Sequence, residues 1–196
     1  MILLDLDNVL ADFETVYRGL INDITNRNAT REEITDYSFA KALGLSPEEN
    51  ALVWRTFNER EMWRDLEPFP YARELVERLK RFAALAVVSN RPEAVFDLTR
   101  EWLERNGIEV DEVYVTESPS KREYLRGKGK RPVLVIEDAP VHAREFSEER
   151  IPVILLDAPW NRFCRSEWIY RVRDLEEAAF LAERILSLVP ARAGGL

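Results

Sequence analysis

Short apolar runs that alternate with amphipathic helical patterns are the feature that most limits how this chain can fold. Each run is rich in valine, isoleucine and leucine and lacks a helical period, which is typical of a buried strand. We expect strands at Ile2–Leu6, Ala83–Ser89, Glu109–Thr116, Pro132–Glu137 and Ile151–Leu156. Strands separated by helices predict an α/β fold with a doubly wound, Rossmann-like parallel sheet.

Three stretches outside these runs place apolar side chains on one face of a helix. The sets are Tyr71, Leu75, Val76 and Leu79; Val95, Leu98, Trp102 and Leu103; and Leu175, Ala178, Ala182, Ile185 and Val189. Gly107 follows the second set, at a position where a glycine can end a helix. These helices agree with a doubly wound arrangement.

Residues 14–67 interrupt the alternation because they contain no convincing strand. Within them, Ser46 followed by Pro47 indicates a helix N-cap and first helical position. We therefore expect an α/β core made of residues 1–13 and 68–196, and a small all-helical cap of residues 14–67 inserted after the first strand. The sequence "EPFP" at Glu67–Pro70 would bring the chain back to the sheet.

Composition and charge narrow the class of protein. The chain has 196 residues, of which 46% are hydrophobic, and this is enough for one sizeable core. A formal net charge of -8 argues against broad binding to nucleic acids or anionic membranes. No apolar run is long enough to cross a membrane, and the N-terminus lacks the pattern of a signal peptide. One cysteine, Cys164, cannot form an internal disulfide, so we expect a cytoplasmic protein.

Charged and hydroxyl side chains gather where the predicted strands end. In a doubly wound sheet, ligands bind beyond the carboxyl ends of the strands. The residues at or just after such ends are Asp5, Asp7, Ser89, Lys121, Glu137 and Asp138. Asp5 and Asp7 would repel each other unless a proton or a cation separates them. Because Mg²⁺ prefers oxygen ligands, the cluster predicts a magnesium site.

Four segments carry a resemblance to a known superfamily. In chain order, "DLDNVLADF", "VVSNRPE", "SPSKREYL" and "VIEDAP" resemble the four motifs of the haloacid dehalogenase superfamily of phosphohydrolases. The resemblance covers residues 1–13 and roughly 68–165, and the helical insert lies where this superfamily carries a cap. The first motif together with "PWNR" at Pro159–Arg162 is similar to the 5'(3')-deoxyribonucleotidase branch. Asn8 replaces the usual glycine, and Glu137–Asp138 replaces two aspartates.

The resemblance implies a mechanism and a role for each matching residue. Asp5 would attack phosphorus and form an aspartyl-phosphate. Asp7 would protonate the leaving alkoxide and then activate the hydrolytic water. Asp5, the backbone carbonyl of Asp7, and Asp138 would hold Mg²⁺. Ser89 would donate a hydrogen bond to a phosphoryl oxygen, and Lys121 would balance the charge of the phosphoryl group and the nucleophile.

Two of these assignments leave alternatives open. Lys128 and Lys130 belong to the same basic loop as Lys121, and any of the three lysines could be a surface charge. We favour Lys121 because it precedes a helical pattern. Glu137 is either a metal ligand or a neighbour that supports one, and we favour Asp138 as the ligand.

Candidate substrate-binding residues lie within the segments of the second and first motifs. Asn90 would sit beside Ser89 and donate to the substrate. Arg91 either contacts the substrate or begins a helix ahead of Pro92. In the deoxyribonucleotidase branch an aromatic residue at the position of Phe13 helps to form the base pocket, although Phe13 also suits a core position.

Further aromatic residues could border the site. Trp54, Phe57 and Trp63 are expected to pack the cap against itself, with Trp63 the first choice to face the substrate. Trp160 and Asn161 follow the last predicted strand, so they could wall the edge of the active site, with Asn161 at the substrate.

We therefore expect a Mg²⁺-dependent phosphomonoesterase that acts on a small phosphorylated metabolite such as a nucleotide, as a monomer or homodimer. One alternative is a phosphatase for polynucleotide ends, against which the charge and the cap argue. Another is a receiver-like phospho-acceptor domain, but receivers lack a large insert after the first strand. The single histidine, His142, is expected to be a helix residue near the site, since the chemistry does not need it.

Overall fold

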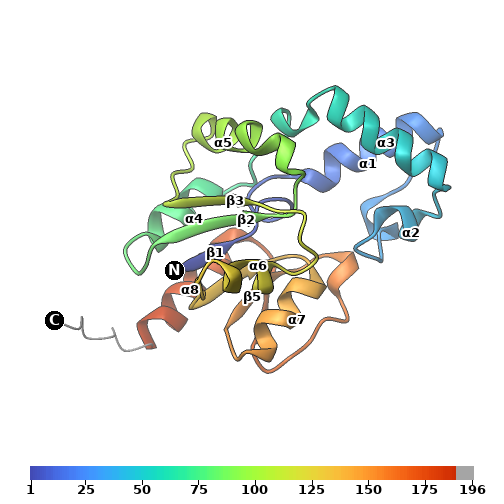
Figure 1. Ribbon diagram of the computed structural model, residues 1–196. Coiled ribbons are helices and arrows are strands. Elements are labelled where there is room, and N and C mark those ends of the chain that lie inside the picture. The colour runs from blue at the N-terminus through green and yellow to red at the C-terminus, as the bar shows by residue number, and fades with distance from the viewer. Residues whose placement is uncertain (189–196) are drawn as a thin grey trace.

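A six-stranded parallel sheet forms the centre of the computed structural model, which describes residues 1–188 (Figure 1). The strands are β1 (Ile2–Leu4), β2 (Leu85–Ser89), β3 (Glu112–Val115), β4 (Leu134–Glu137), β5 (Val153–Leu156) and β6 (Ile169–Val172). Their order across the sheet is β3-β2-β1-β4-β5-β6, and every neighbouring pair is parallel. The strand order reverses between β1 and β4, and the carboxyl ends at such a switch point border the ligand crevice of this fold class.

The structure confirms the predicted doubly wound α/β fold and adds one strand. Each of the five predicted strands is present, and the four after β1 begin two or three residues later than predicted. The missed strand, β6, lies at the edge of the sheet and contains the half-exposed Tyr170 and Arg171. An edge strand of four residues with polar side chains lacks the apolar run that marks the buried strands.

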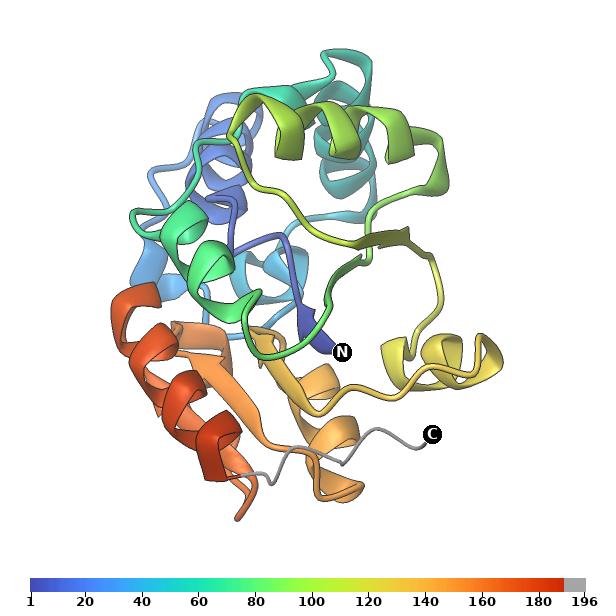
Figure 2. The same cartoon turned by 90° about the vertical axis from the view of Figure 1, so that its left-hand side faces the viewer.

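Helices cover both faces of the sheet. They are α4 (Ala72–Leu79), α5 (Phe96–Arg105), α6 (Lys121–Gly127), α7 (Pro140–Glu148) and α8 (Leu175–Leu188), with 3-10 turns η3 (Glu93–Val95) and η4 (Pro159–Asn161). Ile2 and Leu4 pack in the core shared with α4, α5 and α8, whereas Leu3 packs with α6 and α7. This alternation follows from the two-residue period of a strand. Figure 2 shows α4 and α8 side by side.

Two of the predicted helices correspond to α5 and α8. Gly107, with φ of +63°, directly follows the turn that ends α5, as predicted. The predicted last helix corresponds to α8, and Val189 lies outside the described residues.

The segment between β1 and α4 is helical, as predicted. It contains α1 (Phe13–Thr25), α2 (Phe39–Leu43) and α3 (Pro47–Glu59), with 3-10 turns η1 (Arg31–Glu33) and η2 (Met62–Arg64). We call residues 14–67 the helical insert. Ser46 caps α3, with Pro47 at the first helical position. The helices of the insert gather at one end of the sheet, at the right of Figure 1.

The two linkers of the helical insert pair with each other. The Asp12 amide donates to the Glu67 carbonyl at 2.8 Å, and the Phe69 amide donates to the Leu10 carbonyl at 2.9 Å. The two points where the chain enters and leaves the helical insert are therefore held together directly beyond the end of β1. Among residues 1–188, no helix has the length and apolar character needed to cross a membrane.

Candidate active site

Three carboxylates converge at the switch point of the sheet. Asp5 follows β1, while Glu137 ends β4 and Asp138 follows it. One oxygen from each side chain lies within 4.8 Å of the others, and all three residues are buried. Neighbouring parallel strands bring these residues together because their carboxyl ends share one edge.

Lys121 is the buried cation of this cluster. Its Nζ lies 2.7 Å from Asp5 Oδ1 and 3.0 Å from Glu137 Oε2. Burial of Asp5 favours its neutral form and by itself would raise its pKa. The adjacent Lys121 ammonium outweighs this effect and holds the pKa of Asp5 below its ordinary value. Likewise, burial opposes the charged lysine, but the carboxylates of Asp5 and Glu137 raise the pKa of Lys121 above its ordinary value. Asp5 is thus a carboxylate paired with an ammonium.

The two rival lysines of the basic loop lie elsewhere. The Lys128 ammonium stands over the ring of Tyr124, 4.9 Å from its centroid, and Lys130 pairs with Glu112. Of the three lysines, Lys121 is the one whose ammonium contacts the acidic cluster. Its part in the reaction stays a prediction.

Asp138 offers an oxygen without a partner. Its Oδ2 accepts from Trp160 Nε1 at 2.9 Å and from Asn8 Nδ2 at 3.3 Å, whereas its buried Oδ1 has no hydrogen-bond partner in the described structure. Burial and then the charge of Asp5 raise the pKa of Asp138 well above its ordinary value, and the same two causes act on Glu137. A bare, buried carboxylate oxygen beside other carboxylates fits a hard divalent cation.

Glu137 has less freedom to bind a cation. Its Oε2 accepts from Lys121, and its Oε1 accepts from the Ala139 amide at 3.2 Å. This geometry agrees with the preference for Asp138 as the ligand, which stays a prediction.

Asn8 shapes the turn after Asp7. Its φ is +62°, a left-handed conformation that asparagine tolerates better than most residues. Its Oδ1 accepts from the Glu14 amide at 2.8 Å, and its Nδ2 reaches Asp138. Asn8 therefore links the start of α1 to the acidic cluster, a contact that glycine could not make.

Asp7 faces the carboxyl end of β2. Ser89, fully buried, donates from Oγ to Asp7 Oδ2 at 3.3 Å. Arg91 pairs with both carboxylate oxygens of Asp7. The guanidinium is buried against a protein carboxylate, and a substrate contact of Arg91 stays a prediction.

A cavity of about 310 Å³ opens above these residues, between the sheet and the helical insert. Asp5, Asp7 and Lys121 line one side, and Phe13 together with the helical insert supplies aromatic side chains on the other. The aromatic lining residues are Phe13, Tyr17, Tyr37, Phe39, Trp54 and Trp63. The Phe13 ring stacks on Tyr17 with centroids 4.9 Å apart and on Trp63 at 5.8 Å, so Phe13 both packs the insert and borders the cavity.

Tyr37 of the helical insert also lines the site and was not predicted from the sequence. Tyr37 as a whole is 41% exposed, but it lines the cavity beside the carboxylates. Burial there raises the pKa of its phenol well above the ordinary value, and the charges of Asp138, Asp5, Glu137 and Asp7 follow as causes. The hydroxyl therefore lies within electrostatic range of the site carboxylates. No local pattern marks this tyrosine, because its partners are distant in sequence.

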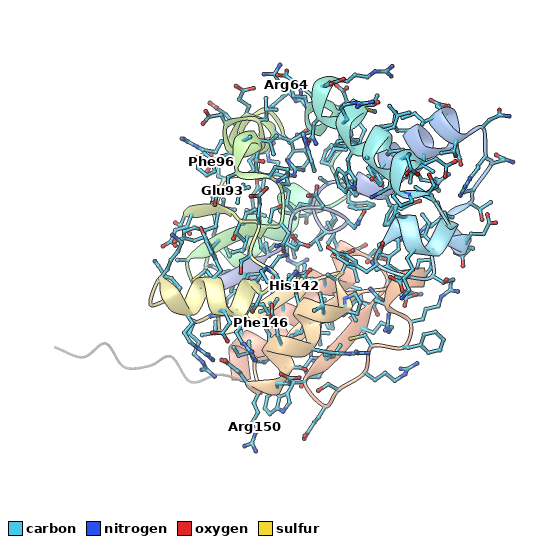
Figure 3. All side chains as sticks on the ribbon, turned by 45° about the vertical axis from the view of Figure 1, so that its right-hand side comes forward. Arg64, Glu93, Phe96, His142, Phe146 and Arg150 are labelled. Atoms are coloured by element: carbon cyan, nitrogen blue, oxygen red, sulfur yellow. The ribbon has the colours of Figure 1, made fainter. Side chains whose placement is uncertain are left out.

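The remaining candidate site residues make hydrogen bonds to the protein backbone or lie on a nearby helix. Asn90 lines the cavity, and its amide donates to the Ser118 carbonyl at 2.8 Å. Asn161 is buried and donates to the carbonyl oxygens of Asp138 and Leu156, so it braces the loop after β4; its substrate contact stays a prediction. His142 lies on α7 one turn before Phe146 (Figure 3).

Comparison with solved structures defines the fold of the chain. A haloacid dehalogenase-like protein of Agrobacterium tumefaciens superimposes with a TM-score of 0.73 at 14% identity, covering 94% of this chain and 97% of that one. CbbY from Rhodobacter sphaeroides, solved in complex with phosphate, gives a TM-score of 0.65 at 20% identity, covering 95% and 98%. The chain therefore has the haloacid dehalogenase-like fold.

Sequence comparison defines the family. The family described as "5' nucleotidase, deoxy (Pyrimidine), cytosolic type C protein" matches residues 1–186, and the chain belongs to it. "Putative nucleotidase YqfW" of Bacillus subtilis is 27% identical over 176 residues, 89% of each chain. "Putative nucleotidase BH1399" of Halalkalibacterium halodurans is 26% identical over 176 residues, 89% of this chain and 88% of that one. The chain is therefore a phosphatase of this nucleotidase family with the haloacid dehalogenase-like fold, which confirms the predicted family and rules out the receiver-like alternative.

Proposed function

We propose that this phosphatase hydrolyses the phosphomonoester of a nucleotide through an aspartyl-phosphate on Asp5, with Mg²⁺ as cofactor. The observation that carries the proposal is the convergence of Asp5, Lys121 and the unpartnered oxygen of Asp138 at one crevice. We further propose that residues 1–13 and 68–196 act as the catalytic core and the helical insert acts as a cap.

In the first step, a carboxylate oxygen of Asp5 forms a bond to phosphorus as the ester P–O bond breaks. The electron pair of that bond goes to the leaving oxygen, and Asp7 supplies the proton that completes the alcohol product. Lys121 balances negative charge where nucleophile and phosphoryl group meet. When the phosphate binds, Ser89 Oγ donates its hydrogen bond to a phosphoryl oxygen in place of Asp7 Oδ2.

In the second step, Asp7 takes a proton from water as the water oxygen attacks phosphorus. The bond between phosphorus and Asp5 breaks, which releases phosphate and restores both carboxyl groups. The 20% exposure of the Asp7 side chain provides access to this proton donor and acceptor.

The residues that would hold Mg²⁺ are Asp5, Asp138 and the backbone carbonyl of Asp7. When bound, the cation supplies positive charge that lets an anionic nucleophile approach an anionic phosphate. Glu137 supports the site by anchoring Lys121. Without the cation, burial leaves Asp138 with a raised pKa and a bare oxygen, which is the state that a cation relieves.

The cavity and the family support a nucleotide as substrate. An apolar, aromatic lining opposite the reacting carboxylates suits a flat base, while the phosphate lies against Asp5 and Lys121. Asn90 and Tyr37 border the same cavity and would contact the leaving group.

The test is a phosphatase assay over a panel of ribo- and deoxyribonucleoside monophosphates, sugar phosphates and short 3'- or 5'-phosphorylated oligonucleotides. Each substrate is assayed with Mg²⁺ and with EDTA. We expect Mg²⁺-dependent release of phosphate that is fastest with a nucleoside monophosphate. A preference for oligonucleotide ends, or equal activity in EDTA, would contradict the proposal.

A further inference from the structure

Arg91 makes a contact that substrate binding does not explain. It lies two residues beyond β2, and its side chain has no exposed surface. Arg91 Nη2 lies 2.7 Å from Asp7 Oδ1, and Arg91 Nε donates to Asp7 Oδ2 at 2.9 Å. Because a guanidinium that engages both carboxylate oxygens fixes the plane of the carboxylate as well as its position, Arg91 determines how Asp7 faces the cavity.

Two further contacts hold Arg91 itself. Its Nη1 donates to Thr99 Oγ1 in α5 at 3.2 Å. Trp63 in η2 of the helical insert covers the guanidinium, with Arg91 Cζ 4.8 Å from the ring centroid. Trp63 is fixed in turn because its Nε1 donates to Asn58 Oδ1 in α3 at 2.9 Å. A continuous set of contacts therefore runs from the helical insert through Arg91 to Asp7.

We propose that Arg91 is a positioning residue that orients Asp7 for proton transfer, and that Trp63 of the helical insert keeps Arg91 in that orientation. The inference rests on the proposed function, since it takes Asp7 as the proton donor. It adds that docking of the helical insert sets the geometry of the acid. Arg91 itself does not touch the substrate, because Asp7, Thr99 and Trp63 enclose its guanidinium.

The dependence of rate on leaving-group basicity reports on this geometry. A basic leaving oxygen needs the proton from Asp7 as the P–O bond breaks, whereas a nitrophenolate departs as a stable anion. The parameter kcat/KM covers the steps up to the first irreversible one, here departure of the leaving group. Poor orientation of Asp7 should therefore reduce kcat/KM most for basic leaving groups. A loss of binding or of folded protein should reduce it for all esters alike.

The experiment measures kcat/KM for ring-substituted phenyl phosphates of similar size, from phenyl to 4-nitrophenyl phosphate, at saturating Mg²⁺. Arg91→Lys keeps the positive charge and loses the two-point contact, and we expect it to lose about 100-fold more on phenyl than on 4-nitrophenyl phosphate. For Trp63→Leu we expect a difference of about tenfold in the same direction. Circular dichroism and thermal melting verify that each variant is folded.

Trp54→Leu is the matched control. Trp54 belongs to the same aromatic cluster and lines the same cavity, but its ring packs on Tyr17, Phe13 and Trp63, whereas it is the Trp63 ring that covers Arg91. We expect Trp54→Leu to change kcat/KM by the same factor for every ester. If Trp54→Leu and Trp63→Leu steepen the dependence equally, the part assigned to Trp63 is wrong.

Asp7→Asn, measured in the same series, separates failure of this inference from failure of the proposed function. If Asp7→Asn steepens the dependence and Arg91→Lys does not, the positioning inference is overturned and the proposed function stands. If Asp7→Asn leaves the dependence unchanged, Asp7 is not the acid, and both the positioning inference and the proton transfer proposed for Asp7 are wrong. Should Arg91→Lys fail to fold, Thr99→Val decides: it removes one hydrogen bond to Arg91, and an unchanged dependence would overturn the inference.

Discussion

Replacing Lys121 by methionine tests the charge balance of the acidic cluster. Methionine fills much of the same volume but removes the ammonium that lies 2.7 Å from Asp5 and 3.0 Å from Glu137. The lysine side chain is 1% exposed, so water cannot replace the lost charge. Without Mg²⁺, the variant would contain three converging buried carboxylates and no cation among them.

The size of the effect follows from this burial. Breaking a buried ion pair by removing one partner costs about 3–5 kcal/mol of the free energy of unfolding. For a chain of this length, each kcal/mol lowers Tm by roughly 2–4 °C, so we expect Tm in EDTA to fall by roughly 6–20 °C. Removing one preorganised charge from a phosphoryl-transfer site should also reduce kcat by about 100-fold to 1000-fold.

The assay compares thermal unfolding of Lys121→Met and Lys128→Met in EDTA and in Mg²⁺. Lys128 caps the end of α6, the helix that Lys121 begins, but it is exposed, so its replacement should change the free energy of unfolding by no more than about 0.5 kcal/mol. Mg²⁺ should raise the Tm of Lys121→Met more than that of the wild-type protein, because the cation replaces part of the lost charge. A Lys121→Met variant as stable and as active as Lys128→Met would refute this reasoning.

Three further predictions concern the metal, pH and the cavity. Asp138→Ala should raise the Mg²⁺ concentration needed for half-maximal activity more than Glu137→Ala does, and a Mg²⁺ titration showing the reverse would exchange their roles. Glu137 and Asp138 have raised pKa values in the folded state. Their protonated side chains therefore contribute fully to stability below the ordinary pKa values of 4.5 and 3.8, and this contribution is lost as the pH rises through the raised pKa values. Urea unfolding in EDTA should thus show lower stability at pH 8 than at pH 5.5, and Mg²⁺ should reduce the difference; equal stability at both pH values would count against the raised pKa values. Phe13→Ala should reduce kcat/KM for a nucleotide about tenfold more than for 4-nitrophenyl phosphate, since base stacking on an aromatic ring contributes about 1–3 kcal/mol; equal losses would assign Phe13 to the scaffold.

Local patterns predicted much of the fold because its elements carry their own signals. Apolar runs marked β1 to β5, and Ser46 with Pro47 marked the start of α3. The runs overestimated strand length because residues that enter a strand, such as Ile151, are also buried. β6 escaped prediction because an edge strand does not need a continuous apolar run.

The candidate site was predictable where residues follow strand ends, and not where contacts cross the fold. Asp5, Lys121 and Asp138 converge because parallel strands align their carboxyl ends. In contrast, Arg91 contacts a carboxylate 84 residues away, and Tyr37 enters from a loop of the helical insert. Such pairings depend on how the insert docks, which no local pattern encodes.

Trapping the phosphorylated enzyme shows whether Asp5 forms the covalent intermediate. Asp7→Asn should form the aspartyl-phosphate from 4-nitrophenyl phosphate but hydrolyse it slowly, because the base that activates water is lost. The variant is mixed with substrate and Mg²⁺, quenched in acid and digested, and its peptides are analysed by mass spectrometry. We expect one phosphoryl group on the N-terminal peptide, at Asp5, and none when Asp5→Asn is added to the same variant. A phosphoryl group on any other residue, or wild-type turnover by Asp5→Asn alone, would contradict it.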